Sequence, residues 1–147
     1  MTKSELLAFM RRHPLAVEAT VSPEGAPQAA VIGVVVSDEL EVFFDTLATS
    51  RKYANLKRDP RVALVMGWDL GEGCTLQLEG SAEEPLGGEL ERLQRLYFAT
   101  FPDGVERRAW PAIAYVRVRP SWLRFSDFRG AAPTIVEFDR ARLDSLG

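Results

Sequence analysis

The sequence has little of the side chains that build covalent or metal-centred sites. Among its 147 residues it contains one cysteine, Cys74, and one histidine, His13. One cysteine cannot form a disulfide within the chain, and together with one histidine it cannot supply the ligands of a Cys/His zinc site. The composition therefore excludes a disulfide-stapled fold, and we expect no metal site.

Long apolar runs and a strong net charge are also missing. No stretch reaches the roughly 18 apolar residues of a membrane-spanning helix, so we expect no membrane association. The first residues, MTKSELLAFMRRH, carry charges where a signal peptide has its apolar centre, which favours a cytoplasmic location. The 18 Lys and Arg against 21 Asp and Glu leave a net charge of −3, which argues against a generally basic nucleic-acid-binding protein.

The pattern of turns and apolar residues predicts a mainly β protein. At 147 residues and 46% hydrophobic composition, with no repeat or linker, residues 1–147 are expected to form a single domain with a packed core. We predict helices over Lys3–His13, Ser50–Arg58 and Gly87–Phe101, and strands over Leu15–Val21, Gln28–Val36, Leu40–Asp45, Arg61–Trp68, Cys74–Ala82, Ala112–Arg119, Trp122–Asp127 and Thr134–Phe138. Turn-length connections favour an antiparallel sheet of six to seven strands, closed or nearly closed into a β-barrel with peripheral helices.

One predicted strand stands out. Gln28–Val36 is β-branched and almost wholly apolar, which predicts burial on both faces. Gly33, in its middle, leaves room for another backbone or a flat ligand to come close.

The charges are unevenly distributed along the chain. Between Thr49 and Arg61 lie five cations and a single acid, Asp59, whereas the next 30 residues, 62–91, contain no Lys or Arg. The cations are Arg51, Lys52, Lys57, Arg58 and Arg61. A basic cluster at the start of a helix, with hydroxyl donors just upstream, is typical of a phosphate site. The residue types alone leave open a second interpretation, in which these are capping residues and a solvated helix face.

The segment from Val42 to Trp68 carries a more specific pattern. It contains Thr46-Leu47-Ala48-Thr49-Ser50-Arg51-Lys52, then Leu56, Asp59-Pro60-Arg61, Ala63-Leu64 and Trp68. This pattern resembles, without an insertion, the FMN-binding split-barrel family whose best-known member is pyridoxamine 5′-phosphate oxidase. Weaker matches follow in Leu76–Gly80, in Tyr97–Pro102, and in Val118–Pro120 with Phe125.

The resemblance implies a split β-barrel that binds FMN. It places Arg51 and Lys52 on the FMN phosphate, and Thr46 and Ser50 near the phosphate or the ribityl chain. It implies a backbone contact from Asp45. The strand from Ala30 to Val35, with Val31, Ile32 and Gly33, would hold the flavin ring through main-chain groups, and Thr75 takes the place of a flavin-contacting Gln. The family also implies a homodimer with the cofactor at the subunit interface, to which Arg107, Arg108 and Trp110 are candidate cross-subunit contributors.

The chain departs from the family pattern at two cofactor contacts and, most tellingly, at the vitamin B6 site. Ala30 replaces an Arg, Ser126 replaces a Trp that packs on the cofactor, and no Arg-x-His pair follows Phe128. Only Arg129 matches a family arginine. Since losing a phosphate clamp removes substrate binding, we interpret the chain as a relative that keeps the cofactor site and acts on an unidentified small molecule.

Two alternatives remain beside an FMN-dependent oxidoreductase. One is a reductase of the same fold that uses the deazaflavin F420, whose phosphate would suit the same cations. The other is a non-catalytic protein that binds flavin or haem. Among single residues, we expect His13 to cap a helix, Cys74 to be buried and inert, and the tryptophans Trp68, Trp110 and Trp122 to belong to the core.

Overall fold

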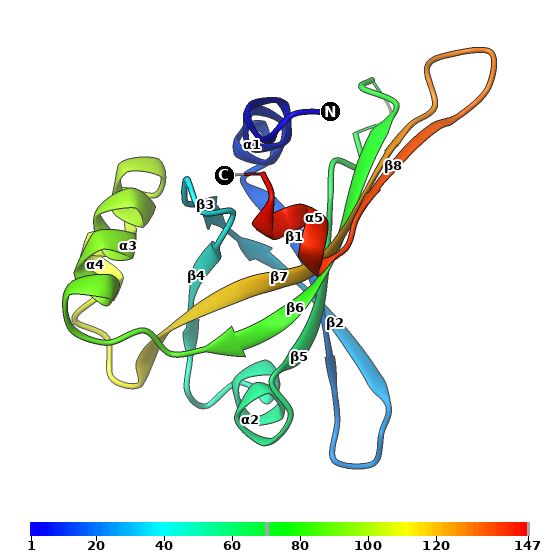
Figure 1. Cartoon of the computed structure of the whole chain (residues 1–147). Helices are drawn as coiled ribbons and strands as arrows, with labels where there is room; N and C mark the ends of the chain where they lie inside the picture. Colours follow the sequence, from blue (N-terminus) through cyan, green and yellow to red (C-terminus); the bar gives the residue numbers. More distant parts are fainter. Residues whose placement is uncertain (70, 147) are drawn as a thin grey trace.

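The computed structural model describes residues 1–69 and 71–146. Its elements, in chain order, are α1 (Lys3–Arg12), β1 (Leu15–Val21), β2 (Pro27–Gly33), β3 (Val35–Val36), β4 (Val42–Leu47), α2 (Arg51–Arg58), β5 (Arg61–Met66), β6 (Cys74–Glu83), α3 (Gly87–Thr100), α4 (Gly104–Arg107), β7 (Ile113–Asp127), β8 (Thr134–Phe138) and α5 (Arg140–Asp144) (Figure 1). The mainly β fold that the sequence predicts is confirmed. The short helices α4 and α5 were not predicted.

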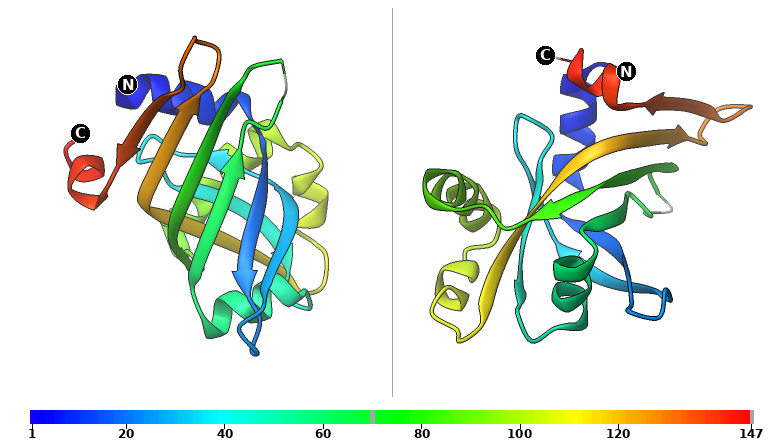
Figure 2. Two further views of the ribbon diagram at one scale, coloured as in Figure 1. Left: turned by 90° about the vertical axis from the view of Figure 1, so that its right-hand side faces the viewer. Right: turned by 60° about the horizontal axis from the view of Figure 1, so that its bottom comes forward.

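The strands form one curled antiparallel sheet. Its order is β2-β1-β5-β6-β7-β4-β3, and β8 pairs with β7 outside this path. The two ends of the sheet belong to one extended segment, because only Val34 separates β2 from β3. The sheet therefore curls until its ends meet at Val34. β2 and β4 are not paired with each other in the described sheet, so the barrel stays open along that seam (Figure 2). This is the predicted split barrel.

Strand β2 differs from its prediction. Its residues alternate between exposed and partly buried, and Val31 is 61% exposed. The expectation of burial on both faces fails for residues 28–31, because β2 lies at the end of the sheet and no described element covers its outer face. Within β2, only Ile32 reaches the core. The end of the predicted strand, residues 34–36, is buried as expected.

Strand β7 joins two predicted strands into one of 15 residues. The predicted strands are separated by Pro120-Ser121, and proline cannot donate to a sheet ladder. The strand continues because the pairing shifts there: Gly80 faces Pro120 and Glu79 faces Trp122, which leaves Ser121 as the extra residue of a bulge. One long strand can thus pair with β4 at its start and with β8 at its end.

The helices cover the ends and part of the outer face of the barrel. Helix α1 begins with a capping box between Thr2 and Glu5 and buries Leu6, Phe9 and Met10, as its spacing predicts. Helix α3 covers the outer face of β4, where the Tyr97 ring meets the Phe43 ring edge-on at 5.9 Å. Helix α2 lies at the end of the barrel where β4 ends and β5 begins (Figures 1 and 2). No helix in the described ranges is long and apolar enough to cross a membrane.

Candidate anion-binding site

The start of helix α2 has the features of an anion-binding helix terminus. Ser50 is the N-cap, and its Oγ accepts a hydrogen bond from the Tyr53 amide at 3.2 Å. The Thr46 hydroxyl lies 3.2 Å from the same Oγ, so β4 holds the cap in place. The first helical residues are Arg51 and Lys52, whose amides have no partner within the helix. Helix dipole and side-chain charge therefore favour an anion at this point.

A pocket of about 200 Å³ opens in front of this helix start. Strands β1 and β2 and the first turn of α2 line it with Glu18, Thr20, Gln28, Ala29, Ala30, Ser50, Arg51 and Lys52. In the described part of the chain, neither Arg51 nor Lys52 forms an ion pair or a side-chain hydrogen bond. Two cations are thus available to a ligand at one pocket.

The other three cations of the basic cluster do not join them. Lys57 pairs with Glu84 at 2.8 Å, and Arg61 pairs with Asp59 at 2.6 Å. Arg58 donates to the carbonyl of Val21. Of the five cations that suggested a phosphate pocket, only Arg51 and Lys52 line the pocket at the start of α2. The helical turn points the others away, toward partners of their own.

The wall of the pocket opposite Arg51 and Lys52 is polar, and hydrogen bonds link its side chains to α2. Asn55, buried on α2, donates through Nδ2 to the Thr20 hydroxyl at 3.0 Å and to Gln28 Oε1 at 2.9 Å. This amide ties α2 to β1 and β2, which sets the distance across the pocket. Beside them lies Glu18, which is 1% exposed and has no hydrogen-bond partner on either carboxylate oxygen in the described structure. Burial raises the pKa of Glu18 to about 7, although the charge of Lys52 opposes this shift.

The sequence prediction missed Glu18, Thr20, Gln28 and Asn55. A signal was present for the first two, because the alternation of Leu15–Val21 places Glu18 and Thr20 on the same inward face as Ala16. A carboxylate on the apolar face of a strand is unusual enough to mark a site. Nothing in the sequence places Asn55 against them.

The remaining predicted site residues are spread over the barrel. Ser50, Arg51, Lys52 and Ala30 line the pocket, and Thr46 contacts Ser50. Val31 points outward from β2, Ile32 points into the core, and Thr75 is the second residue of β6, opposite Ser126.

Two predicted residues have other contacts. The space beside Gly33 is filled by the Phe101 ring, since a Cβ there would lie 2.9 Å from its Cζ. A flat ring does lie against this glycine, but it belongs to the protein. The Asp45 carboxylate accepts hydrogen bonds from the Tyr97 hydroxyl at 2.9 Å and from Arg107 at 2.8 Å. Its side chain therefore faces α3 and α4, and only its backbone is free for a contact near the pocket.

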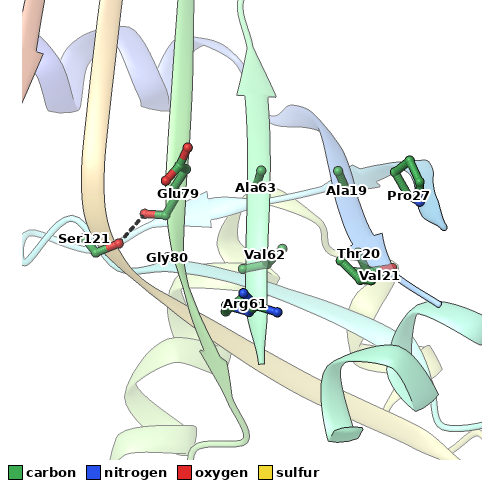
Figure 3. Close-up of a pocket in the computed structure, with 10 residues that line it drawn as sticks. All are labelled: Ala19, Thr20, Val21, Pro27, Arg61, Val62, Ala63, Glu79, Gly80 and Ser121. Atoms are coloured by element: carbon green, nitrogen blue, oxygen red, sulfur yellow. Dashed lines mark hydrogen bonds between the residues drawn. The ribbon is translucent and has the colours of Figure 1, made fainter. Parts of the chain in front are cut away.

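The outer face of the sheet carries small and apolar side chains. Val31, Val17 and Val65 lie side by side across β2, β1 and β5, and the next row is Ala29, Ala19 and Ala63. A groove of about 390 Å³ lies on this face and reaches Gly80 and Ser121 on β6 and β7. Ala19 and Ala63 line it (Figure 3).

The prediction that the tryptophans belong to the core fails for all three, since Trp122 is only partly buried and lies outside the core cluster. Trp68 is 46% exposed and Trp110 is 52% exposed, so neither belongs to the core. Arg107 pairs with Asp45 within its own chain, and Arg108 lies over the Phe98 ring at 6.0 Å. His13 caps α1 and lies 3.0 Å from a Glu72 oxygen, and Cys74 is buried, as predicted.

The fold and the site define a class of protein: a split antiparallel β-barrel with a pocket beside its open seam that is lined by two cations at a helix start. The family model described as pyridoxamine 5′-phosphate oxidase matches residues 2–127 of the chain. The protein therefore belongs to the pyridoxamine 5′-phosphate oxidase family.

Individual relatives are more distant. The pyridoxine/pyridoxamine 5′-phosphate oxidase of Rubrobacter xylanophilus is 35% identical over 94 residues, which are 64% of this chain and 41% of that protein. This chain thus matches less than half of that relative's length.

Solved structures share the fold at low identity. A haem-binding protein of Mycobacterium smegmatis superposes with a TM-score of 0.84 at 16% identity, over 97% of this chain and 60% of that chain. A pyridoxamine 5′-phosphate oxidase-related, FMN-binding protein of Nostoc punctiforme superposes with a TM-score of 0.66 at 14% identity, over 93% and 84%. Related barrels therefore include proteins that bind FMN and proteins that bind haem.

Proposed function

We propose that this protein binds FMN and acts in the cytoplasm as an FMN-dependent oxidoreductase on a small molecule. The observation that carries the proposal is the pocket at the start of α2, where Arg51 and Lys52 have no partner among the described residues. A phosphate monoester carries about two negative charges at neutral pH, which matches two free cations and a helix N-terminus. When bound, FMN would supply hydride or electron-pair transfer at its N5 atom.

The residues of this chain have separate tasks in this proposal. Arg51 and Lys52 bind the phosphate, and Ser50 with Thr46 adds hydroxyl groups beside it. The free edge of β2, from Ala30 onward, offers backbone N–H and C=O groups to the flavin ring, because β2 pairs only with β1 in the described sheet. The backbone of Asp45 and the hydroxyl of Thr75 are further candidate contacts.

The substrate is proposed to differ from pyridoxamine phosphate. The family arginine that Arg129 matches is engaged here, because Arg129 forms two hydrogen bonds to Asp127 at 2.9 and 2.6 Å. The other basic residue of the pocket beside it, Arg12, lies 3.7 Å from a Glu72 oxygen, so neither cation is left unpaired to clamp the phosphate of a B6 vitamer. Activity with a different small molecule is therefore favoured.

Cofactor titration tests this function. We expect the purified protein to bind FMN, with flavin absorption near 450 nm, more tightly than riboflavin, which has no phosphate. Arg51→Ala with Lys52→Ala should weaken FMN binding by roughly 100-fold, since each charged hydrogen bond contributes about 1.5–3 kcal/mol. Lys57→Ala with Arg61→Ala is the matched control, since it removes the same charge from the same segment but outside the pocket. Equal affinity in the two double variants would refute the assignment. Tighter binding of F420 than of FMN would move the protein to the deazaflavin class.

A haem-binding function is the second candidate, favoured by the fold of the Mycobacterium smegmatis protein. His13, the single histidine of the chain, lies 3.0 Å from Glu72, which occupies its Nε2 atom. Haem binding would give an intense Soret band on titration with haemin, and His13→Ala should remove it if this residue is the ligand. A flavin spectrum without a Soret band supports the first candidate.

We further propose that the protein is a homodimer, with the outer face of β2, β1 and β5 at the interface. The row of Val31, Val17 and Val65 is a flat apolar surface, of which Val31 is 61% and Val65 is 37% exposed. A second copy would cover it and bring a partner surface to the open edge of β2. Light scattering should give about twice the 16.4 kDa of one chain, and Val31→Glu should give the monomer mass. A monomeric wild-type protein would refute this interface.

A further inference from the structure

Glu18 is the least explained group of the pocket. It lies in the middle of β1, directly opposite Ala30 of β2, and its side chain points to the inside of the barrel. It is 1% exposed, yet neither carboxylate oxygen has a hydrogen-bond partner in the described structure. Burying a polar group without a partner costs about 1–3 kcal/mol, and more if it is charged. Such a group is either a defect or a part of a binding site.

The charged groups around Glu18 come from one element. Arg51 and Lys52 of α2 line the same pocket, whereas the residues that β1 and β2 contribute besides Glu18 are uncharged. At the level of Glu18, β5 and β6 turn Leu64 and Leu78 inward. From β4 and β7 the inward side chains are also uncharged: Phe44, Thr46, Ala114 and Val116. Glu18 therefore faces two cations on one side and an apolar interior on the others.

A phosphate in this pocket would meet Glu18 as well as the cations. An ionised carboxylate would repel a phosphate dianion, since two like charges in a poorly hydrated site disfavour each other. A protonated carboxyl group would instead donate an O–H hydrogen bond to a phosphate oxygen. The positive charge of Lys52 would then be balanced by the phosphate and not by Glu18. The carboxyl group of Glu18 would then have the hydrogen-bond partner that it lacks in the ligand-free protein.

We propose that Glu18 is a phosphate-binding residue of this pocket, which contacts the ligand in its protonated form and so couples phosphate binding to the uptake of one proton. This inference rests on the proposed function, because it needs a phosphate-bearing ligand at α2. It adds a residue and a pH dependence to that site. Because burial raises the pKa of Glu18 to about 7, the carboxyl group already carries its proton in slightly acidic solution and must take one from solvent in alkaline solution.

Calorimetric titration with FMN between pH 7 and pH 8.5 tests the coupling. The FMN phosphate is a dianion across this range, since its second pKa is about 6. We expect wild-type affinity to fall roughly 15-fold from pH 7 to pH 8.5, as the protonated fraction of a group with this pKa falls. At pH 8.5, the binding heat in buffers of different ionisation enthalpy should report close to one proton taken up per FMN.

Glu18→Gln is the decisive variant. Its amide donates a hydrogen bond at every pH, so FMN affinity should be nearly independent of pH and no proton should be taken up. The control is Glu91→Gln, which changes an exposed glutamate of α3, away from the pocket and from the proposed interface, and should keep the wild-type pH dependence. A wild-type protein that binds FMN equally at both pH values, or a Glu18→Gln variant with the wild-type pH dependence, would overturn the role of Glu18 while leaving FMN binding intact. Failure of the wild-type protein to bind FMN at any pH would overturn the proposed function, and with it this inference.

Discussion

Replacing Glu18 should change how the stability of the ligand-free protein depends on pH. Its ordinary pKa of 4.5 applies to the unfolded chain, and burial raises the pKa to about 7 in the folded protein. Below pH 4.5 both states are protonated, so the group contributes nothing to the pH dependence. Between these values the folded state holds a proton that the unfolded chain releases, and the free energy of unfolding falls as pH rises.

The magnitude follows from the shift. Stability should fall by about 1.4 kcal/mol for each pH unit between 4.5 and 7, and the total loss above pH 7 should be about 3 kcal/mol. A domain is stable by only about 5–15 kcal/mol, so a loss of this size is easily measured. Glu18→Gln keeps the shape of the side chain and removes the ionisation. Relative to wild type, the variant should gain about 2.5 kcal/mol between pH 5 and pH 8.5.

Urea unfolding at pH 5 and pH 8.5 measures this gain. The buried amide has a constant cost at both pH values, so the difference between the two comparisons isolates the ionisation of Glu18. Glu91→Gln, at an exposed position of α3, should show no such change. If the stability difference between Glu18→Gln and wild type is the same at pH 5 and pH 8.5, Glu18 does not change its charge in this range, and the reasoning from its burial is wrong.

Two further substitutions test the packing around the site. Asp45→Asn should destabilise the protein by about 1–3 kcal/mol in urea unfolding, because it removes the charge that Arg107 and Tyr97 contact, whereas Asp103→Asn, at an exposed partner of Arg107, should cost under about 1 kcal/mol; equal effects would contradict the role of Asp45. Gly80→Ala should cost about 1–3 kcal/mol, because its Cβ would lie 2.5 Å from the backbone oxygen of Arg119 at the bulge. Gly88→Ala, which meets nothing within 4 Å at the start of α3, should be neutral or stabilising, and a Gly80→Ala variant as stable as this control would show that the bulge can shift.

Much of the fold follows from local pattern. The bounds of β1 and β8 agree with prediction, and α1 buries the predicted Leu6, Phe9 and Met10. The prediction failed where a residue's effect depends on its neighbours in the sheet. Pro120 breaks a regular strand, but the bulge opposite Gly80 lets β7 continue. The apolar β2 suggested a buried strand, but it lies at the end of the sheet.

The candidate site shows the same division. The motif around Ser50-Arg51-Lys52 led to the start of α2, where the structure has a pocket. The sequence could not show that Lys57 and Arg58 turn away to Glu84 and to the carbonyl of Val21, since these partners lie 27 and 37 residues away along the chain. Nor could it show that Glu18 has no partner.

The sequence by itself determined the class of fold, the family and the position of the helix with the basic first turn. These depend on the spacing of apolar residues, turns and capping groups, which act over a few neighbouring residues. Only the tertiary structure decided which charges face the pocket and which are neutralised elsewhere. The state of a charge depends on the distance to its partner and on its access to water, and both are set by strands and helices that meet only when the barrel forms. For this reason two cations and one unpartnered carboxyl group, rather than a cluster of five cations, define the site.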